Sequence, residues 1–239
     1  DLHSFPTRRS SDLTKTSILN MNDNNWWQNP FDNQLRGYDS KRLPQAIVKD
    51  AIKDHEALMI LRAGENRIPI KSYEANRFVL GGKASLAWLR KGALLIACDP
   101  NHTVLFQAGV INRKHRTIEV GLDSTQIPGN CSQAIGPPIV DSGLPGQCQQ
   151  QAYDFQTLSY ITDYYAAIYY LSMSVSGKSS AIYREALTLS SKQGRVSSRR
   201  EELSSGIAQM SFRYDLDVDQ DGYAEARRTA AEIRQQGLA

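Results

Sequence analysis

The stretch ALLIACDPNHTVLFQA (residues 93–108) decides the fold of this chain. Two apolar runs, Ala93–Cys98 and Thr103–Ala108, lie on either side of the segment Asp99–His102 (DPNH). Each run is only six residues long and rich in aliphatic or β-branched side chains, which is the pattern of buried strands rather than of helices. Pro and Asn at the centre of the connecting segment favour a tight turn. The stretch therefore predicts two paired strands.

The same pattern recurs on both sides of this hairpin. Short runs bounded by turn residues predict further strands, and SGKSS (176–180) predicts the turn of a second hairpin. Five tyrosines (160, 164, 165, 169 and 170) lie in or next to that second hairpin, where we expect them to pack in the core. The period-two alternation of Ile207–Tyr214 predicts a strand with one face on a core. The remaining predicted strands are Ala57–Arg62, Thr117–Leu122, Ala166–Val175 and Ala181–Thr188, and the one predicted helix is Tyr223–Gln236.

Composition excludes several classes of protein. The 239 residues carry 28 Lys and Arg against 25 Asp and Glu, and a net charge of +3 is too small a surplus for a dedicated nucleic-acid binder. The longest apolar stretches, Ala57–Leu61 and Ala93–Cys98, are far shorter than the roughly 20 residues of a membrane-spanning helix. The N-terminus has no apolar core region of a signal peptide. We therefore expect a mostly antiparallel β protein with long loops.

The three cysteines bear on the compartment of the protein. Cys131 and Cys148 flank a loop rich in Pro and Gly that could not pack on its own. A disulfide between them would close a loop of about 18 residues and stabilise the fold by roughly 3 kcal/mol. The alternative is three free thiols in a reducing compartment. Cys98, at the end of an apolar run, has no evident partner in either case.

An acidic loop follows the last predicted strand. Asp217, Asp219, Asp221 and Gly222 form a D-x-D-x-D-G pattern in which alternate carboxylates can converge on one point, and hard oxygen ligands of this kind suit Ca²⁺. Tyr223 would add its backbone carbonyl, and Glu225 stands at the ninth position. Arg228 occupies the twelfth position, where an EF-hand loop has a bidentate acid, so the loop is half of that motif. The alternatives are a calcium site and a solvated acidic turn.

No catalytic motif is present. Gly82-Lys83 and Gly177-Lys178 lack the glycine that a phosphate-binding loop has five positions earlier, where Arg77 and Ser172 stand. The sequence has no G-x-S-x-G, H-E-x-x-H or C-x-x-C, and its histidines are scattered among turns and polar segments. We therefore expect a protein that is not an enzyme. A small basic cluster (Lys192, Arg195, Arg199, Arg200) is expected to be a solvated turn, or else a contact for an acidic partner or for DNA.

Four stretches, taken in order, resemble the PilW family of type IV pilus minor pilins. The similarity touches most of residues 29–225, and its weight lies in the order and spacing of the four pieces. The pieces are NPFDNQLRGYDSKRLP (Asn29–Pro44), ALLIACDPNHTVLFQAG (Ala93–Gly109), PGNCS (Pro128–Ser132) and EELSSGIAQMSFRYDLDVDQDGYAE (Glu201–Glu225).

The resemblance implies an α+β fold, in which a pilin-like antiparallel sheet with long loops packs against an N-terminal helix. That helix would be missing from this chain. Residues 1–13 (DLHSFPTRRSSDL) match a translated sequencing adapter, and we expect them to be an artefact. Residues 14–239 would then be one pilin-like globular domain, truncated at both ends.

The resemblance also implies a function. The protein would be a non-enzymatic minor pilin that primes pilus assembly and supports twitching motility and cell adhesion. Its partners would be other minor pilins, the major pilin and the inner-membrane assembly machinery, with no specific nucleic acid. It would occupy the inner membrane, through the missing helix, and the periplasm before it enters the extracellular pilus. The rival is a secreted, β-rich, calcium-dependent module that binds carbohydrate or a surface through Trp26, Trp27 and Trp88.

Overall fold

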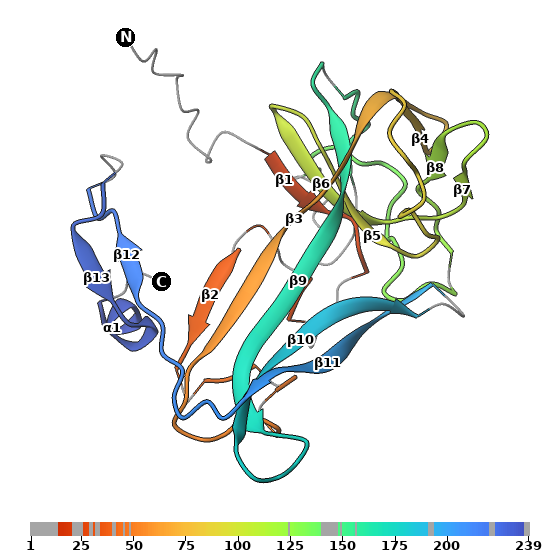
Figure 1. Cartoon of the computed structure of the whole chain (residues 1–239). Helices are drawn as coiled ribbons and strands as arrows, with labels where there is room; N and C mark the ends of the chain where they lie inside the picture. The colour runs from red at the N-terminus through yellow and green to blue at the C-terminus, as the bar shows by residue number, and fades with distance from the viewer. Residues whose placement is uncertain are drawn as a thin grey trace. The chain divides into compact units, whose positions relative to one another are not determined.

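The computed structural model shows a nearly all-β protein (Figure 1). It describes residues 14–20, 26–28, 31, 34–39, 42–44, 46–47, 49–123, 125–139, 148, 150–155, 157–190, 194–219 and 223–236. Of these, 49% lie in strands and 3% in helix. The strands are β1 (Thr14–Ser17), β2 (Leu35–Tyr38), β3 (Ala57–Glu74), β4 (Arg77–Leu80), β5 (Leu94–Cys98), β6 (His102–Gln107), β7 (Ile111–Asn112), β8 (Thr117–Glu119), β9 (Tyr160–Met173), β10 (Ser180–Ser190), β11 (Arg195–Ser205), β12 (Tyr214–Leu216) and β13 (Ala226–Arg228), and the helix is α1 (Ala230–Gln235).

The predicted α+β fold class is wrong. The large sheet is mixed, because β1 pairs with β6 in parallel, whereas β2 with β3, β3 with β4, β4 with β8, β5 with β6, β5 with β9, β7 with β8 and β9 with β10 pair antiparallel. Only six residues of the described chain are helical, and they form α1. No helix among the described residues is long and apolar enough to cross a membrane. Residues 1–13, which we expect from the sequence to be an artefact, lie outside the described part.

The chain divides into two compact units. Unit 1 takes the described residues within Asp1–Asp23, Ala63–Tyr164 and Leu189–Ser197. Unit 2 takes those within Asn24–Arg62, Tyr165–Thr188 and Ser198–Ala239. The long strands β3, β9, β10 and β11 contribute residues to both.

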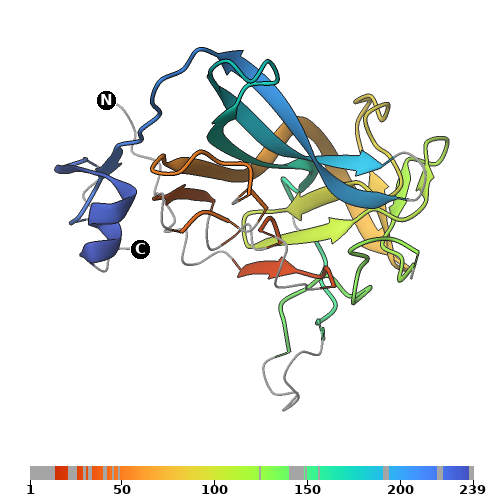
Figure 2. The ribbon, with the colours of Figure 1, turned by 90° about the horizontal axis from the view of Figure 1, so that it is seen from below.

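Unit 1 is built on the predicted hairpin. β5 pairs antiparallel with β6 in the register Cys98↔Thr103, and the Asp99 carboxylate accepts hydrogen bonds from the backbone N–H groups of Asn101 and His102, each at 2.8 Å. These bonds hold the turn. β1, in red, lies beside β6 (Figure 2). The first four residues of β9, Tyr160–Asp163, pair antiparallel with β5. The rest of the ladder runs β3–β4–β8–β7.

The core of unit 1 is aliphatic and aromatic. Phe78 of β4 packs against Phe106 of β6 with ring centroids 5.1 Å apart and against Phe155 at 5.5 Å. Tyr73 closes the other side of Phe78 at 4.6 Å and donates its hydroxyl hydrogen to the Gln133 carbonyl. The two apolar runs of the predicted hairpin, Ala93–Cys98 and Thr103–Ala108, also contribute buried side chains to unit 1, as predicted.

A buried amide group fastens the end of β6 to three loops. The Gln107 side chain is fully buried, and its Nε2 donates to the carbonyls of Gly92 and Gly194 at 2.7 and 2.8 Å. Its Oε1 accepts a hydrogen bond from the Gly129 N–H at 2.7 Å. Gly92 has φ +86°, and a Cβ there would lie 2.4 Å from the Gly194 Cα, so only glycine fits this crossing.

Unit 2 contains a five-strand array in the order β2–β3–β9–β10–β11. β2 lies wholly in unit 2, and the other four strands contribute the part of their length that belongs to this unit. β9 and β10 pair antiparallel as predicted, with Tyr170 opposite Tyr183. Tyr170 is buried, and so is Tyr164 in the unit 1 part of β9, which confirms core packing for these two tyrosines, whereas Tyr160, Tyr165 and Tyr169 are half-buried.

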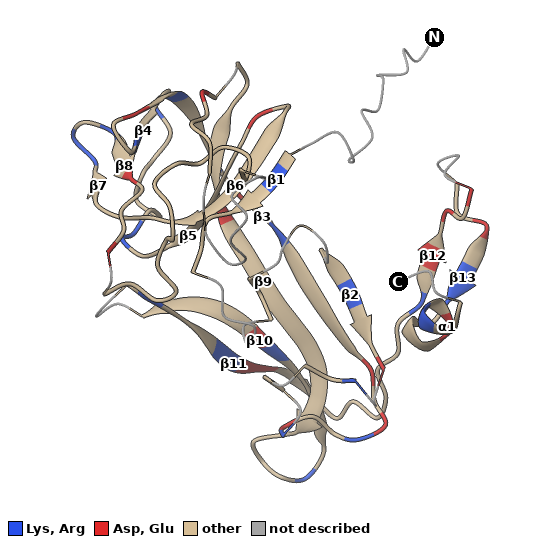
Figure 3. Ribbon diagram, turned by 180° about the vertical axis from the view of Figure 1, so that it is seen from behind, with Lys and Arg blue, Asp and Glu red and all other residues tan. Residues whose placement is uncertain are grey.

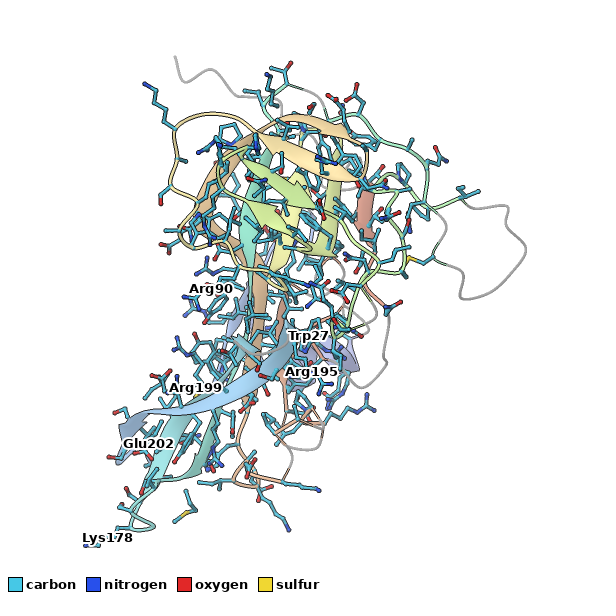
Figure 4. The ribbon with its side chains drawn as sticks, turned by 90° about the vertical axis from the view of Figure 1, so that its right-hand side faces the viewer. Trp27, Arg90, Lys178, Arg195, Arg199 and Glu202 are labelled. Atoms are coloured by element: carbon cyan, nitrogen blue, oxygen red, sulfur yellow. A yellow bond between two sulfur atoms is a disulfide. The ribbon has the colours of Figure 1, made fainter. Side chains whose placement is uncertain are left out.

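β11 was missed by the sequence prediction. Its side chains are almost all exposed, and among the described strands its partner is β10, with one isolated bridge from Arg195 to Ile127. Arg200 anchors it to the rest of the sheet: its guanidinium lies 4.0 Å from the centroid of the Tyr183 ring, donates to the Ser172 hydroxyl at 2.6 Å and pairs with Asp50 at 3.2 Å. Figure 4 labels its neighbours Arg199 and Glu202 on the same strand.

The C-terminal part of unit 2 departs most from the predictions. The predicted strand Ile207–Tyr214 is wrong except for Tyr214, because Gly206 ends β11 with φ +77° and residues 207–213 pair with no strand. The predicted helix Tyr223–Gln236 is shortened to α1, because Ala226–Arg228 pairs with Tyr214–Leu216 as β13. Thr229 and Glu232 then form a capping box at the start of α1.

Candidate metal centre

The predicted acidic loop is the connection between β12 and β13. The two strands pair in the register Leu216↔Ala226, so residues 217–225 leave and re-enter a short antiparallel ladder. Glu225 N–H donates to the Leu216 carbonyl at 3.0 Å and extends the ladder by one bond. The backbone pairing therefore brings the start and the end of the loop together.

Three of the predicted ligand residues meet at this point. Asp217, Asp219 and Glu225 each offer a carboxylate oxygen, and these oxygens lie within 4.8 Å of one another. Glu225 Oε2 also accepts a hydrogen bond from the Val218 N–H at 2.7 Å, which orients its carboxylate toward the start of the loop. Asp221 and Gly222 lie outside the described residues, and Tyr223 is 76% exposed. The cluster could hold a metal ion through hard oxygen ligands, although all three side chains are exposed.

Arginines support the base of the loop. Arg227 donates from Nε and one terminal nitrogen to the two oxygens of Asp215, at 2.7 and 3.3 Å, across the β12–β13 pair. These bonds lower the pKa of the Asp215 carboxyl. Arg228, which stands at the twelfth position of the motif, lies in β13 opposite Tyr214 and is a strand residue. The loop therefore lacks the bidentate acid of an EF-hand, and its strands are fixed by an ion pair instead.

The structure contains the disulfide that the cysteine spacing suggested. Cys131 and Cys148 are bonded, with Cα atoms 5.6 Å apart. Cys98 has a free thiol at the end of β5, where burial raises its pKa and a hydrogen bond with Tyr160 partly offsets that rise. The raised pKa keeps the Cys98 thiol protonated, and a thiol is a weaker nucleophile than a thiolate.

The sequence places His102 at the end of the β5–β6 turn, which is confirmed, but the histidine is not a surface side chain. The side chain is fully buried, its Nε2 lies 2.6 Å from the Ile135 carbonyl, and its ring packs 4.5 Å from that of Tyr153. Burial lowers the pKa of His102. The residue is part of the unit 1 core rather than a candidate acid or base.

Two other sequence candidates are changed by the structure. Trp27 is only 5% exposed, so it cannot form a sugar-binding platform with Trp26 and Trp88. Of the predicted basic cluster, Lys192 lies outside the described residues, and Arg200 is the anchor of β11. Arg195 and Arg199 are exposed on that strand rather than in a turn.

No protein-family model, curated protein or solved structure matches this chain. Function must therefore be argued from the residues themselves.

Proposed function

We propose that this chain is a non-enzymatic structural subunit of a type IV pilus, a minor pilin that helps to prime pilus assembly and supports twitching motility and adhesion. The observation that carries the proposal is the ordered set of four stretches that resemble the PilW family. The second of these stretches is the β5–β6 hairpin on which unit 1 is built, and the third carries Cys131 of the disulfide. A β-rich, disulfide-bonded protein suits the oxidising periplasm and the cell surface.

The proposed partners are other minor pilins, the major pilin and the inner-membrane assembly machinery. The test is to delete the gene in the source bacterium and to shear surface fibres from deleted and complemented cells. The chain should co-sediment with the sheared fibres, and its deletion should lower both their amount and the twitching zone. Recovery of the chain as free secreted protein, with unchanged fibres, would refute the proposal.

The carboxylates Asp217, Asp219 and Glu225 are proposed to bind Ca²⁺ and to stiffen the β12–β13 loop. Their oxygens already converge, and carboxylate oxygen is the ligand that Ca²⁺ prefers. Calorimetry should detect heat on addition of Ca²⁺ to the protein and none with an Asp217→Asn, Asp219→Asn double variant. Glu65→Gln, which removes an exposed carboxylate outside the cluster, is the matched control. Equal heats for all three proteins would refute the site.

The acidic cluster also keeps a second candidate function open, that of a secreted calcium-dependent binding module. This candidate cannot use the three tryptophans together, because Trp27 is buried. The two functions are separated by the fibre experiment, since a secreted module would remain in the culture medium and leave the fibres unchanged.

A further inference from the structure

The outer edge of β11 offers backbone groups to a further strand. The N–H of Val196 donates to the Ile127 carbonyl at 2.9 Å rather than to β10. Backbone groups of successive residues in a strand turn to opposite sides, so those of every second residue after Val196 also turn away from β10. These residues are Ser198, Arg200, Glu202 and Ser204. Among the described residues, no strand pairs with β11 on that side.

This edge is open in the part of β11 that belongs to unit 2. Residues 198–201 and 203–205 are exposed, and Glu202 is half-buried. Gly206 ends the strand with φ +77°, and a Cβ built there would meet nothing within 4 Å in the described structure. The edge from Ser198 to Ser204 is therefore accessible to a second extended segment. Figure 4 labels Arg199 and Glu202 in this part of the strand.

The charges on this edge are of both signs and stand in two blocks. Arg199 and Arg200 are followed directly by Glu201 and Glu202, and Figure 3 shows basic and acidic residues next to one another on β11. Edge strands are commonly kept from pairing by Lys, by Pro or by bulges. β11 contains neither Lys nor Pro. Its charges therefore suit a strand on which the two blocks run in the opposite order, and the same strand in antiparallel orientation is such a partner.

Side-chain contacts fix which charges share a face of the sheet. Arg184 of β10 donates to the Glu201 carboxylate at 2.5 Å. Residues two apart in a strand lie on the same face, so Arg199 shares the face of Glu201. Arg200 lies on the opposite face, where its guanidinium packs on the ring of Tyr183. Within the described residues, no salt bridge reaches Arg199, so its charge is available to a partner.

We propose that β11 pairs antiparallel with β11 of a second copy of this chain, about a two-fold axis at Arg200. In this register, Arg199 of each copy faces Glu201 of the other. Both charge pairs are of the non-hydrogen-bonded kind, in which the side chains lie closest. The two Arg200 residues face each other, but each guanidinium is held within its own copy by Tyr183 and by Asp50 at 3.2 Å. A register centred on Glu201 would instead set two carboxylates in the closest pair.

The same register gives partners to the outward backbone groups. Arg200 exchanges N–H···O bonds with Arg200 of the second copy, and Ser198 exchanges them with Glu202 of the second copy. These bonds replace bonds to water, so their net contribution is modest and the charge pairs decide the register. Each copy contributes the same strand, so the interface is self-complementary and closes as a dimer.

Sedimentation equilibrium over a range of protein concentrations tests for this dimer. Arg199→Glu alone and Glu201→Lys alone each set like charges opposite one another in both pairs, and each should raise the dissociation constant of the dimer by ~10-fold or more. An equimolar mixture of the two variants restores opposite charges in both pairs and should dimerise within ~3-fold of the parent. Lys178→Glu, an equal charge change at an exposed residue of unit 2 outside β11, is the control and should change the constant by less than ~2-fold.

Hydrogen exchange reports on the paired edge itself. The amides of Ser198, Arg200 and Glu202 should exchange more slowly as the protein concentration rises, because they become bonded to the second copy. The amide of Glu201 turns toward β10 and should not change. Circular dichroism of each variant checks that it is folded.

Four results would overturn the inference. They are a parent chain that stays monomeric at every concentration, a mixture of the two charge variants that stays monomeric, equal weakening by Lys178→Glu, and association without slower exchange of the Ser198 and Arg200 amides. The experiment uses the isolated chain, so its failure leaves the pilus proposal untouched, and failure of the fibre experiment leaves this one untouched.

Discussion

Replacement of Gln107 by Met should destabilise unit 1 far more than its small change in shape suggests. The two side chains have similar length and volume, so no cavity opens. Met cannot, however, donate to the carbonyls of Gly92 and Gly194 or accept from the Gly129 N–H, all of which the Gln107 side chain satisfies. These three groups would be left without their partner in a part of the structure where Gln107 is fully buried.

The size of the effect follows from the three lost bonds. Each buried polar group left without a partner costs about 1–3 kcal/mol. Relaxation of the loops lets some of the groups find other partners, so we expect a loss of about 3–5 kcal/mol rather than the full sum. That is a large part of the total stability of a domain, which is about 5–15 kcal/mol.

Urea unfolding measures the loss in the free energy of unfolding, and hydrogen exchange shows where in unit 1 the structure opens. The free energy of unfolding should fall by the stated amount, and the amides near Gly129 should exchange faster than those of β9. Gln209→Met, at an exposed position, is the control and should change stability by less than ~0.5 kcal/mol. A loss below about 1 kcal/mol for Gln107→Met would show that the amide group is not what holds the loops to β6.

Three further predictions concern other parts of the structure. Replacement of Cys131 and Cys148 together by Ser should lower the free energy of unfolding by about 3 kcal/mol relative to the oxidised parent protein, as measured by urea unfolding, because the disulfide restrains the unfolded chain over a separation of 17 residues. Arg200→Ala should speed hydrogen exchange in β11 by about tenfold and leave β5 unaffected, because the contacts with Tyr183, Ser172 and Asp50 are lost. Unchanged exchange in β11 would contradict the claim that Arg200 anchors this strand to the sheet. Burial lowers the pKa of His102 below its ordinary value of 6.5, so the unfolded chain binds a proton more readily than the folded chain. This contribution to stability is therefore present above pH 6.5 and is lost as the pH falls from there toward the folded pKa. Urea unfolding at a series of pH values should show that loss in the parent and not in His102→Gln.

The parts of the fold that the sequence predicts are those in which local pattern and burial agree. The runs around Asp99–His102 are apolar because both strands of the hairpin are buried. The residues that favour a tight turn, Pro100 and Asn101, lie between them. The second hairpin, β9–β10, is predicted for the same reason. β11 has no such pattern, because an edge strand whose partner among the described strands is β10 can carry RVSSRREELSS on exposed positions.

The remaining errors arise where contacts distant in sequence decide the backbone. The alternation of Ile207–Tyr214 is real, but no neighbouring strand is there to pair with it. Ala226–Arg228 has helical composition and becomes a strand because β12 lies beside it. The capping signal T-x-x-E at Thr229–Glu232 marks the true start of the helix and was available in the sequence. The parallel pairing of β1 with β6 has no local signal at all.

The candidate metal site illustrates the same division. The D-x-D pattern predicts convergent carboxylates, and Asp217 and Asp219 do converge with Glu225, but only because the β12–β13 ladder brings the two ends of the loop together.

The acidic loop lies on a hairpin turn whose strands are held by backbone hydrogen bonds and by the ion pair of Arg227 with Asp215. This ion pair spans the two strands, whereas the proposed ligand carboxylates of Asp217, Asp219 and Glu225 lie in the loop that joins them. Asp219→Asn should therefore lower the affinity for Ca²⁺ and leave the β12–β13 hairpin folded, whereas Arg227→Ala should affect both. Loss of the hairpin on Asp219→Asn would show that the loop is held by the same charges that are proposed to bind Ca²⁺.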